Sequence, residues 1–145
     1  MYTAEEFFTG GSGVVTLCGS TKYFTECMEA NRQLTFKNWI VLMCGSWGHS
    51  YHKNVENTNT DYETVKKLHY QKILMSSCIV VVADSTGYQG ASTKAEVAFA
   101  QYLNIPVFYF DGITFSGSTK DMPRQTLPNI AIIDRFAKLH GTLGF

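Results

Sequence analysis

The segment that decides the fold is Cys78-Ile-Val-Val-Val-Ala83, which runs directly into the polar turn at Asp84. An unbroken apolar run of this length, rich in β-branched residues, is typical of a strand covered on both faces, whereas a half-exposed strand alternates apolar and polar residues. Comparable short runs predict further strands at 14–18, 39–43, 106–110 and, more weakly, 129–133. The sequence therefore predicts five largely buried strands.

Longer amphipathic stretches separate these strands and predict helices over 21–37, 61–76 and 93–104, with a short fourth helix over 134–141. Alternating strands and helices predict an α/β fold, a single-domain doubly wound five-stranded parallel sheet in the flavodoxin-like order 2-1-3-4-5. We treat 1–145 as one domain in which residues 1–12 form an N-terminal extension. Ligands of such sheets bind beyond the carboxyl ends of the strands, so the loops there are the informative ones.

Composition narrows the class of partner. Twelve basic and twelve acidic residues give a net charge of zero, which lacks the positive surface that nucleic-acid binding needs. A hydrophobic fraction of 45% is enough to build a core. No run approaches the ~18 apolar residues of a membrane span, and the first residues carry no basic leader. We expect a cytoplasmic protein that binds neither nucleic acid nor membrane.

The cysteines and histidines show no pattern typical of a metal site. The cysteines are scattered through apolar stretches without a C-x-x-C pair, and no histidine lies at ligand spacing beside them. We therefore expect no metal, and reduced, buried thiols in preference to disulfides.

The first informative loop contains Gly19, Ser20 and Thr21, at the point where a strand ends and a helix begins. A glycine permits close backbone approach, and free N–H groups at a helix start favour an anion or a sugar-phosphate. The same residues equally fit a tight turn in which Ser20 or Thr21 caps the helix.

The second loop, Cys44-Gly-Ser-Trp-Gly-His-Ser-Tyr-His52, interleaves aromatic and imidazole groups with small residues. Aromatic faces stack on nucleobases, so we predict that Trp47 contacts a ligand. An ordinary surface loop with one anchoring Trp is the alternative.

The third loop is the densest and runs from Asp84 to Glu96. One carboxylate on each side of a cleft is the minimal set for attacking a carbon and protonating a leaving group. The spacing also permits structural roles, because Thr93 and Glu96 have the capping-box spacing at the start of a helix, and Asp84 can cap its loop. Glycines and hydroxyl side chains in the same loop are candidate substrate contacts: Gly87, Gly90, Ser92 and Thr93.

The segment from Gly87 to Ala100, followed by Asn104-Ile-Pro-Val107, resembles the glutamate-containing signature of the nucleoside 2-deoxyribosyltransferase superfamily. Val15-Thr-Leu-Cys-Gly-Ser-Thr21 is similar to its opening strand and glycine turn. Leu68-His-Tyr-Gln-Lys-Ile73 resembles small phage and bacterial members of unknown function. The resemblance covers about residues 13 to 110.

This resemblance implies that Glu96 is the nucleophile on C1′ of a sugar and that Asp84 lies near the base and is linked to its protonation. His69 stands where the transferases carry a further aspartate, and periodicity also permits a core role for it. Asn104 replaces a glycine, which is tolerable because Asn accepts the left-handed helix cap.

We therefore expect an enzyme that cleaves or transfers the N-glycosidic bond of a small nucleoside or nucleoside 5′-monophosphate, with no cofactor. The rivals are a nucleotide-binding protein that has lost turnover and a flavodoxin-like interaction domain without a ligand. Family members borrow residues from neighbouring subunits, so we also expect a homodimer or a dimer of dimers. The stretch Ser116-Gly-Ser-Thr119 fits either a phosphate contact to a neighbouring subunit or a flexible linker.

Overall fold

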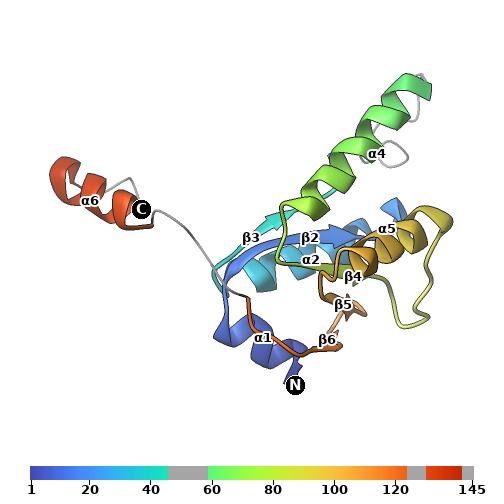
Figure 1. Cartoon of the computed structure of the whole chain (residues 1–145), viewed down its shortest axis with the longest axis horizontal. Helices are drawn as coiled ribbons and strands as arrows, with labels where there is room; N and C mark the ends of the chain where they lie inside the picture. Colours follow the sequence, from blue (N-terminus) through green and yellow to red (C-terminus); the bar gives the residue numbers. More distant parts are fainter. Residues whose placement is uncertain (46–58, 124–129, 142–145) are drawn as a thin grey trace.

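A computed structural model describes residues 1–45, 59–123 and 130–141 and has an α/β fold built on a mostly parallel sheet (Figure 1). The sheet runs in the order β3 (Trp39–Leu42), β2 (Gly13–Cys18), β4 (Cys78–Val82), β5 (Val107–Phe110) and β6 (Phe115–Ser116). The first four strands are parallel, and β6 is antiparallel to β5. Cys18, at the end of β2, pairs with Val81 of β4, so both strands end at the same edge of the sheet.

Strand β4 is buried on both faces, as its unbroken apolar run predicts. Successive side chains of a strand point to opposite faces. Cys78, Val80 and Val82 belong to one core cluster, and Ile79 and Val81 to another, and each of the five is at most 1% exposed. Two hydrophobic layers therefore hold this strand in place.

The helices that cover the sheet lie close to their predicted positions. A 3₁₀ turn, η1 (Thr21–Tyr23), leads into α2 (Phe24–Thr35), which packs on the face of the first cluster. Helices α4 (Asn59–Leu74) and α5 (Ala91–Tyr102) contribute to the second cluster. Asn104 has φ 58°, so the expected left-handed cap after α5 is confirmed.

The fifth predicted strand is wrong. Residues from Ile130 onward form the helix α6 (Ile130–His140), and the last place in the sheet belongs to the antiparallel β6. The predicted order 2-1-3-4-5, with five parallel strands, therefore fails at its final member. The reason is periodicity: Ile132, Ile133, Phe136 and Leu139 repeat at helical spacing, which a window of five residues cannot separate from a strand.

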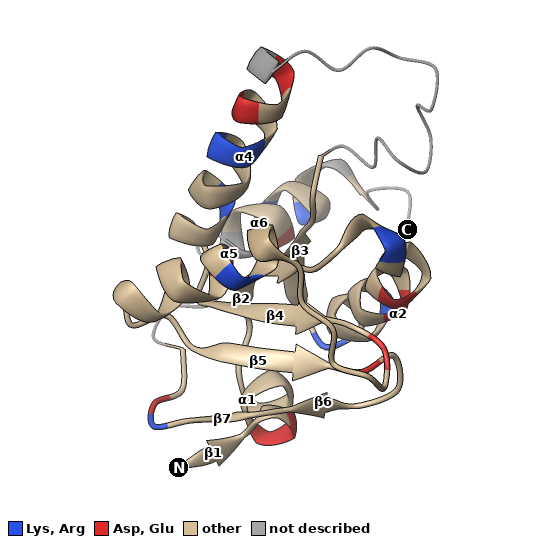
Figure 2. Ribbon diagram, turned by 90° about the vertical axis from the view of Figure 1, so that its right-hand side faces the viewer, with Lys and Arg blue, Asp and Glu red and all other residues tan. Residues whose placement is uncertain are grey.

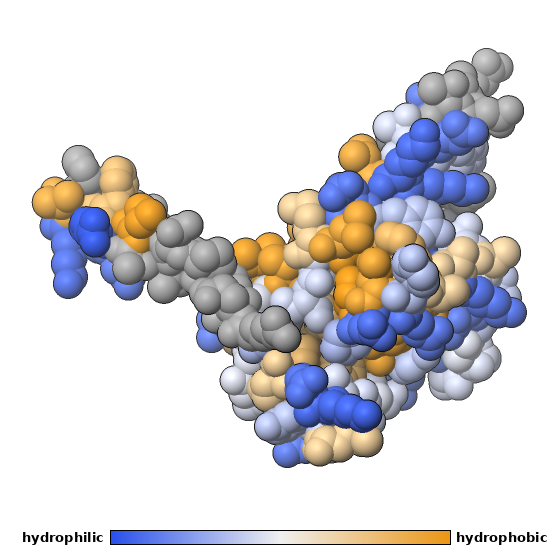
Figure 3. All heavy atoms as spheres, in the orientation of Figure 1, coloured by the Kyte–Doolittle hydropathy of each residue, from blue (hydrophilic) through white to orange (hydrophobic). Residues whose placement is uncertain are grey.

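Helix α6 lies apart from the sheet and presents its apolar residues to solvent (Figures 1 and 3). Ile132, Ile133, Phe136 and Leu139 are between 50% and 74% exposed.

Residues 1–12, treated above as an extension, contribute directly to the core. After β1 (Tyr2–Thr3), the helix α1 (Ala4–Gly10) begins with a capping box between Thr3 and Glu6. Phe7 and Phe8 are each 1% exposed and pack on Trp39 and Phe108 with ring centroids 4.9–5.4 Å apart. The short strand β7 (Ser118–Thr119) pairs with β1 beside this helix (Figure 2), so the stretch 116–119 is not a flexible linker.

No disulfide joins the four cysteines; Cys18, Cys27 and Cys78 are buried as expected, whereas Cys44 is half-buried. Within the described part of the chain, no helix combines the length and apolar character that crossing a membrane requires.

Candidate active site

A cavity of about 420 Å³ opens at the carboxyl end of β2, within the size range of small-molecule sites. Its walls come from the turn after β2, the end of β3, the first turns of α4 and the start of α5. Predicted site residues on the first wall are Gly19, Ser20 and Thr21. Those contributed by the helices are His69, Gly90, Ser92, Thr93 and Glu96. The structure thus brings together residues that lie as far as 77 positions apart.

Asp84 and Gly87 are not among the described residues that line this cavity. The Asp84 carboxylate accepts hydrogen bonds from the hydroxyl and the backbone N–H of Thr86, and these bonds lower the pKa of Asp84. Gly87 closes the same turn with φ +69°. The loop-capping role of Asp84 is therefore observed. Trp47 lies outside the described residues.

Gly19 is required by the packing of two strand ends. A Cβ at this position would lie 2.6 Å from the backbone carbonyl oxygen of Val82. The next residue, Ser20, caps η1 by accepting a hydrogen bond from the backbone N–H of Lys22 at 3.4 Å. The predicted helix cap at Ser20 is confirmed, and the residue also lines the cavity.

Helix α5 begins earlier than predicted, which changes the position of Glu96. Gly90 is the N-cap, with no side-chain hydrogen bond, so Thr93 is the third helical residue and Glu96 the sixth. The proposed Thr93–Glu96 capping box and the first-turn placement of Glu96 are both wrong. The first-turn residues Ala91, Ser92 and Thr93 line the cavity, and backbone N–H groups at this position of a helix lack intrahelical partners.

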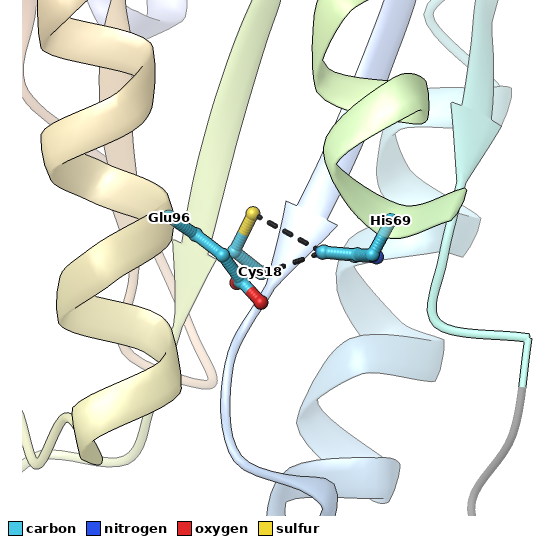
Figure 4. A group of neighbouring side chains, drawn as sticks. All are labelled: Cys18, His69 and Glu96. Atoms are coloured by element: carbon cyan, nitrogen blue, oxygen red, sulfur yellow. Dashed lines mark hydrogen bonds and ion pairs between the residues drawn. The ribbon is translucent and has the colours of Figure 1, made fainter. Parts of the chain in front are cut away.

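Glu96 lies on the wall of the cavity, close to the side chains of His69 and Cys18 (Figure 4). Its Oε2 lies 3.6 Å from Nε2 of His69, and the same nitrogen lies 3.6 Å from Sγ of Cys18. The side chains of His69 and Glu96 are 8% and 15% exposed, and Cys18 is 1% exposed. His69 Nδ1 is buried and has no hydrogen-bond partner among the described residues. We call Cys18, His69 and Glu96 the Cys-His-Glu cluster.

The electrostatics of this cluster argue against a thiol nucleophile. Burial raises the pKa of the Cys18 thiol well above its ordinary value, and the neighbouring Glu96 raises it further. Burial and then Glu96 also raise the pKa of Tyr70. Reactive cysteines require a lowered pKa and access to substrate. Cys18 has neither, because its pKa is raised, it is only 1% exposed, and it is not among the described residues that line the cavity.

On the part of the wall formed by α4, sequence reasoning identified only His69. Asp61, Tyr62, Val65 and Lys66 line the cavity together with His69. The available signal was the spacing of Tyr62, Val65 and His69, which recur on one face of a helix. That face is turned toward the cavity, so the same periodicity marks a ligand-facing surface.

Fold and cavity define the class: an α/β protein with a ligand-sized site at the carboxyl edge of a mostly parallel sheet. In comparisons with known proteins, no family model matches the chain, and no curated protein or solved structure matches it significantly.

Proposed function

We propose that the chain cleaves or transfers the N-glycosidic bond of a small nucleoside or nucleoside 5′-monophosphate, as a relative of the nucleoside 2-deoxyribosyltransferases. The observation that carries the proposal is the place of Glu96. Its carboxylate lines a cavity of ligand size and is 15% exposed, so it is reachable from the cavity yet largely shielded from bulk water. A shielded carboxylate is a suitable nucleophile for a sugar carbon.

In the proposed reaction, an oxygen of Glu96 attacks C1′ while the bond from C1′ to the base nitrogen breaks, and the base leaves with the electron pair. Water or a second base then attacks C1′ and releases Glu96. His69 fixes the carboxylate from the side, through the 3.6 Å approach of Nε2. His69 is a positioning residue in this scheme.

The departing base must also gain a proton. Asp84 was the sequence candidate, but its lowered pKa favours the ionised form, and its oxygen is engaged by Thr86. An ionised carboxylate outside the cavity wall is a poor proton donor to a bound base. We therefore assign the proton to water in the cavity and a turn-shaping role to Asp84.

Hydrogen-bond donors around Glu96 suit the oxygens of a sugar or a 5′-phosphate. Ser20, Thr21 and Ser92 supply hydroxyls, and the first turn of the twelve-residue α5 supplies backbone N–H groups with a positive dipole end. Lys66 adds a cation to the same wall.

The test is a panel of nucleosides and nucleoside 5′-monophosphates incubated with the protein, with free base measured by chromatography. Glu96→Gln keeps the shape of the side chain but removes the anion, so kcat should fall by several orders of magnitude while ligand binding persists. Glu29→Gln, on the outer side of α2 and paired with Arg32, is the matched control and should keep wild-type turnover. A Glu96→Gln variant with more than about a tenth of wild-type kcat contradicts the proposal.

A second candidate function is nucleotide binding without turnover. The position of Asp84 favours it, because the acid that accompanies Glu96 on the described cavity wall is Asp61 and not Asp84, the residue that the resemblance implies. The same panel separates the two functions. Binding measured by calorimetry without release of base from any substrate supports the binding protein.

We also propose that the chain forms a homodimer or a dimer of dimers. The exposed apolar face of α6 supports this, because a face of this kind usually packs against another surface. Light scattering at micromolar concentration is the measurement, and a monomer contradicts the proposal.

A further inference from the structure

We propose that the Cys-His-Glu cluster binds a thiophilic divalent cation, with Zn²⁺ the best fit. Cys18, His69 and Glu96 each offer one ligand atom, and the three atoms lie within 4.8 Å of one another. Sulfur, imidazole nitrogen and carboxylate oxygen are the donor types that Zn²⁺ takes in proteins. Mg²⁺ and Ca²⁺ prefer oxygen ligands alone, so a cysteine donor selects against them.

Two of the three ligand distances in the cluster are close to the edges of a coordination tetrahedron, and the third, from Cys18 to Glu96, is at most 4.8 Å. With zinc bonds of about 2.3 Å to sulfur and about 2.0 Å to nitrogen and oxygen, ligand atoms lie about 3.6 Å apart for S···N and about 3.3 Å for N···O. The corresponding separations are 3.6 Å for Cys18 to His69 and 3.6 Å for His69 to Glu96. The second value is longer than a direct N–H···O hydrogen bond, which spans about 2.7–3.2 Å. The gap between these groups is therefore wide for a hydrogen bond and close to the width that an ion requires.

The fold holds the three donors in place before any ion arrives. They come from the end of β2, the middle of α4 and the second turn of α5, three elements that pack against one another in the second core cluster. Cys18 and His69 are 1% and 7% exposed, so neither side chain is free to swing away. His69 and Glu96 also line the cavity, which leaves the fourth position of a tetrahedral ion to water or a small ligand.

The charge balance of the cluster also favours a cation. Binding displaces the proton of the Cys18 thiol, which leaves to solvent, and a bond forms between the cation and the sulfur. Neutral His69 binds through Nε2 and keeps its proton on Nδ1. A doubly charged cation then meets one thiolate and one carboxylate, so the buried group carries no net charge.

Cobalt is the probe that tests the site, because a thiolate bound to Co²⁺ gives a charge-transfer band in the near ultraviolet. The full chain, stripped with a chelator, is titrated with Co²⁺ and then with Zn²⁺. We expect the band to saturate at one equivalent and to disappear when Zn²⁺ replaces Co²⁺. Cys18→Ser should abolish the band. His69→Gln should weaken Co²⁺ binding by more than about 100-fold, since loss of an outer partner alone costs tenfold to 100-fold.

Cys44→Ser is the matched control, because Cys44 lines the same cavity but is outside the cluster. This variant should keep the full band. A wild-type protein without the band overturns the proposal, and so does a band that survives Cys18→Ser but is lost in Cys44→Ser. If Cys18→Ser does not fold, as judged by circular dichroism, Glu96→Gln replaces it, and undiminished Co²⁺ affinity in that variant overturns the assignment of Glu96.

The cobalt titration measures metal binding alone and does not depend on the release of base. The proposal therefore stands or falls independently of the glycosidase function.

Discussion

The tightest contact beside the cavity predicts a large effect for a small change, Gly19→Ala. The added methyl group would lie 2.6 Å from the carbonyl oxygen of Val82, where ordinary van der Waals contact begins at 3.4 Å. The atom in the way belongs to the backbone of β4, and β2 and β4 are paired at this point through Cys18 and Val81. Neither strand can move away without breaking backbone hydrogen bonds between β2 and β4.

Forcing an extra carbon into a well-packed site costs about 1–3 kcal/mol. We expect Gly19→Ala to fall in the upper half of that range, because the contact atom is not the end of a side chain. Gly90→Ala is the matched control. Gly90 lines the same cavity, but its Cβ would meet only the Tyr88 hydroxyl at 3.6 Å, so this change should cost less than about 1 kcal/mol.

The assay is equilibrium unfolding in urea, with the free energy of unfolding extrapolated linearly to water. Gly19→Ala should be less stable than Gly90→Ala by about 1–2 kcal/mol, with an unchanged dependence on urea concentration. If the two variants unfold at the same urea concentration, the close approach of the strand ends is not what requires a glycine at position 19.

Three further predictions concern other parts of the molecule. Phe7→Ala should lower the free energy of unfolding by about 3–5 kcal/mol in the same assay, whereas Phe36→Ala, at an 80% exposed site, should stay within about 0.5 kcal/mol of wild type. Alkylation of the native protein, read by mass spectrometry, should modify Cys44 first, because burial raises the thiol pKa of the other three cysteines. Hydrogen bonds from Arg32 lower the pKa of Glu29 to about 2, so the stability from this pair is present above pH 4.5 and is lost as the pH falls toward 2. An NMR titration of the Glu29 carboxyl carbon should show a midpoint near that value, and Arg32→Ala should raise the pKa of Glu29.

The parts of the fold that sequence could predict are those coded by local patterns. Short apolar runs such as that of β4 placed four strands correctly. Helical periodicity placed the three helices α2, α4 and α5 correctly. The segment 130–133 was misassigned because four apolar residues fit both a strand and one turn of a helix. Helix α1 was missed although its capping box, Thr3 and Glu6, was visible in the sequence.

The candidate site was predictable where it depends on topology. Ligands gather at the carboxyl ends of parallel strands, and this rule brought the turn at Gly19 and the start of α5 into one prediction. It failed for Asp84, because the rule fixes where a strand ends and not which way the next side chain turns. Thr86, two residues on, offers two donors that hold the carboxylate in its own loop.

The contacts of His69 lay beyond any local pattern. Cys18 is 51 residues away in the chain, and their approach depends on how α4 packs against the end of β2. Metal-ligand spacing in a sequence reveals sites built on one turn or one helix. A site with one ligand from each of three elements leaves no such spacing in the sequence. The expectation of no metal relied on the absence of that spacing, so it could not account for a site of this kind.

The two roles proposed for Glu96 exclude each other at any one moment. A carboxylate attacks C1′ with a lone pair that is free and directed at the sugar, whereas bonding to a cation withdraws electron density from both oxygens and ties the group to Cys18 and His69. A bound ion would also place positive charge beside a sugar carbon that becomes positive as the base departs, which raises the barrier to its departure. The cation-bound form should therefore be inactive as a glycosidase. If both proposals hold, base release would come from the metal-free protein, so the substrate panel should be run both with and without a chelator.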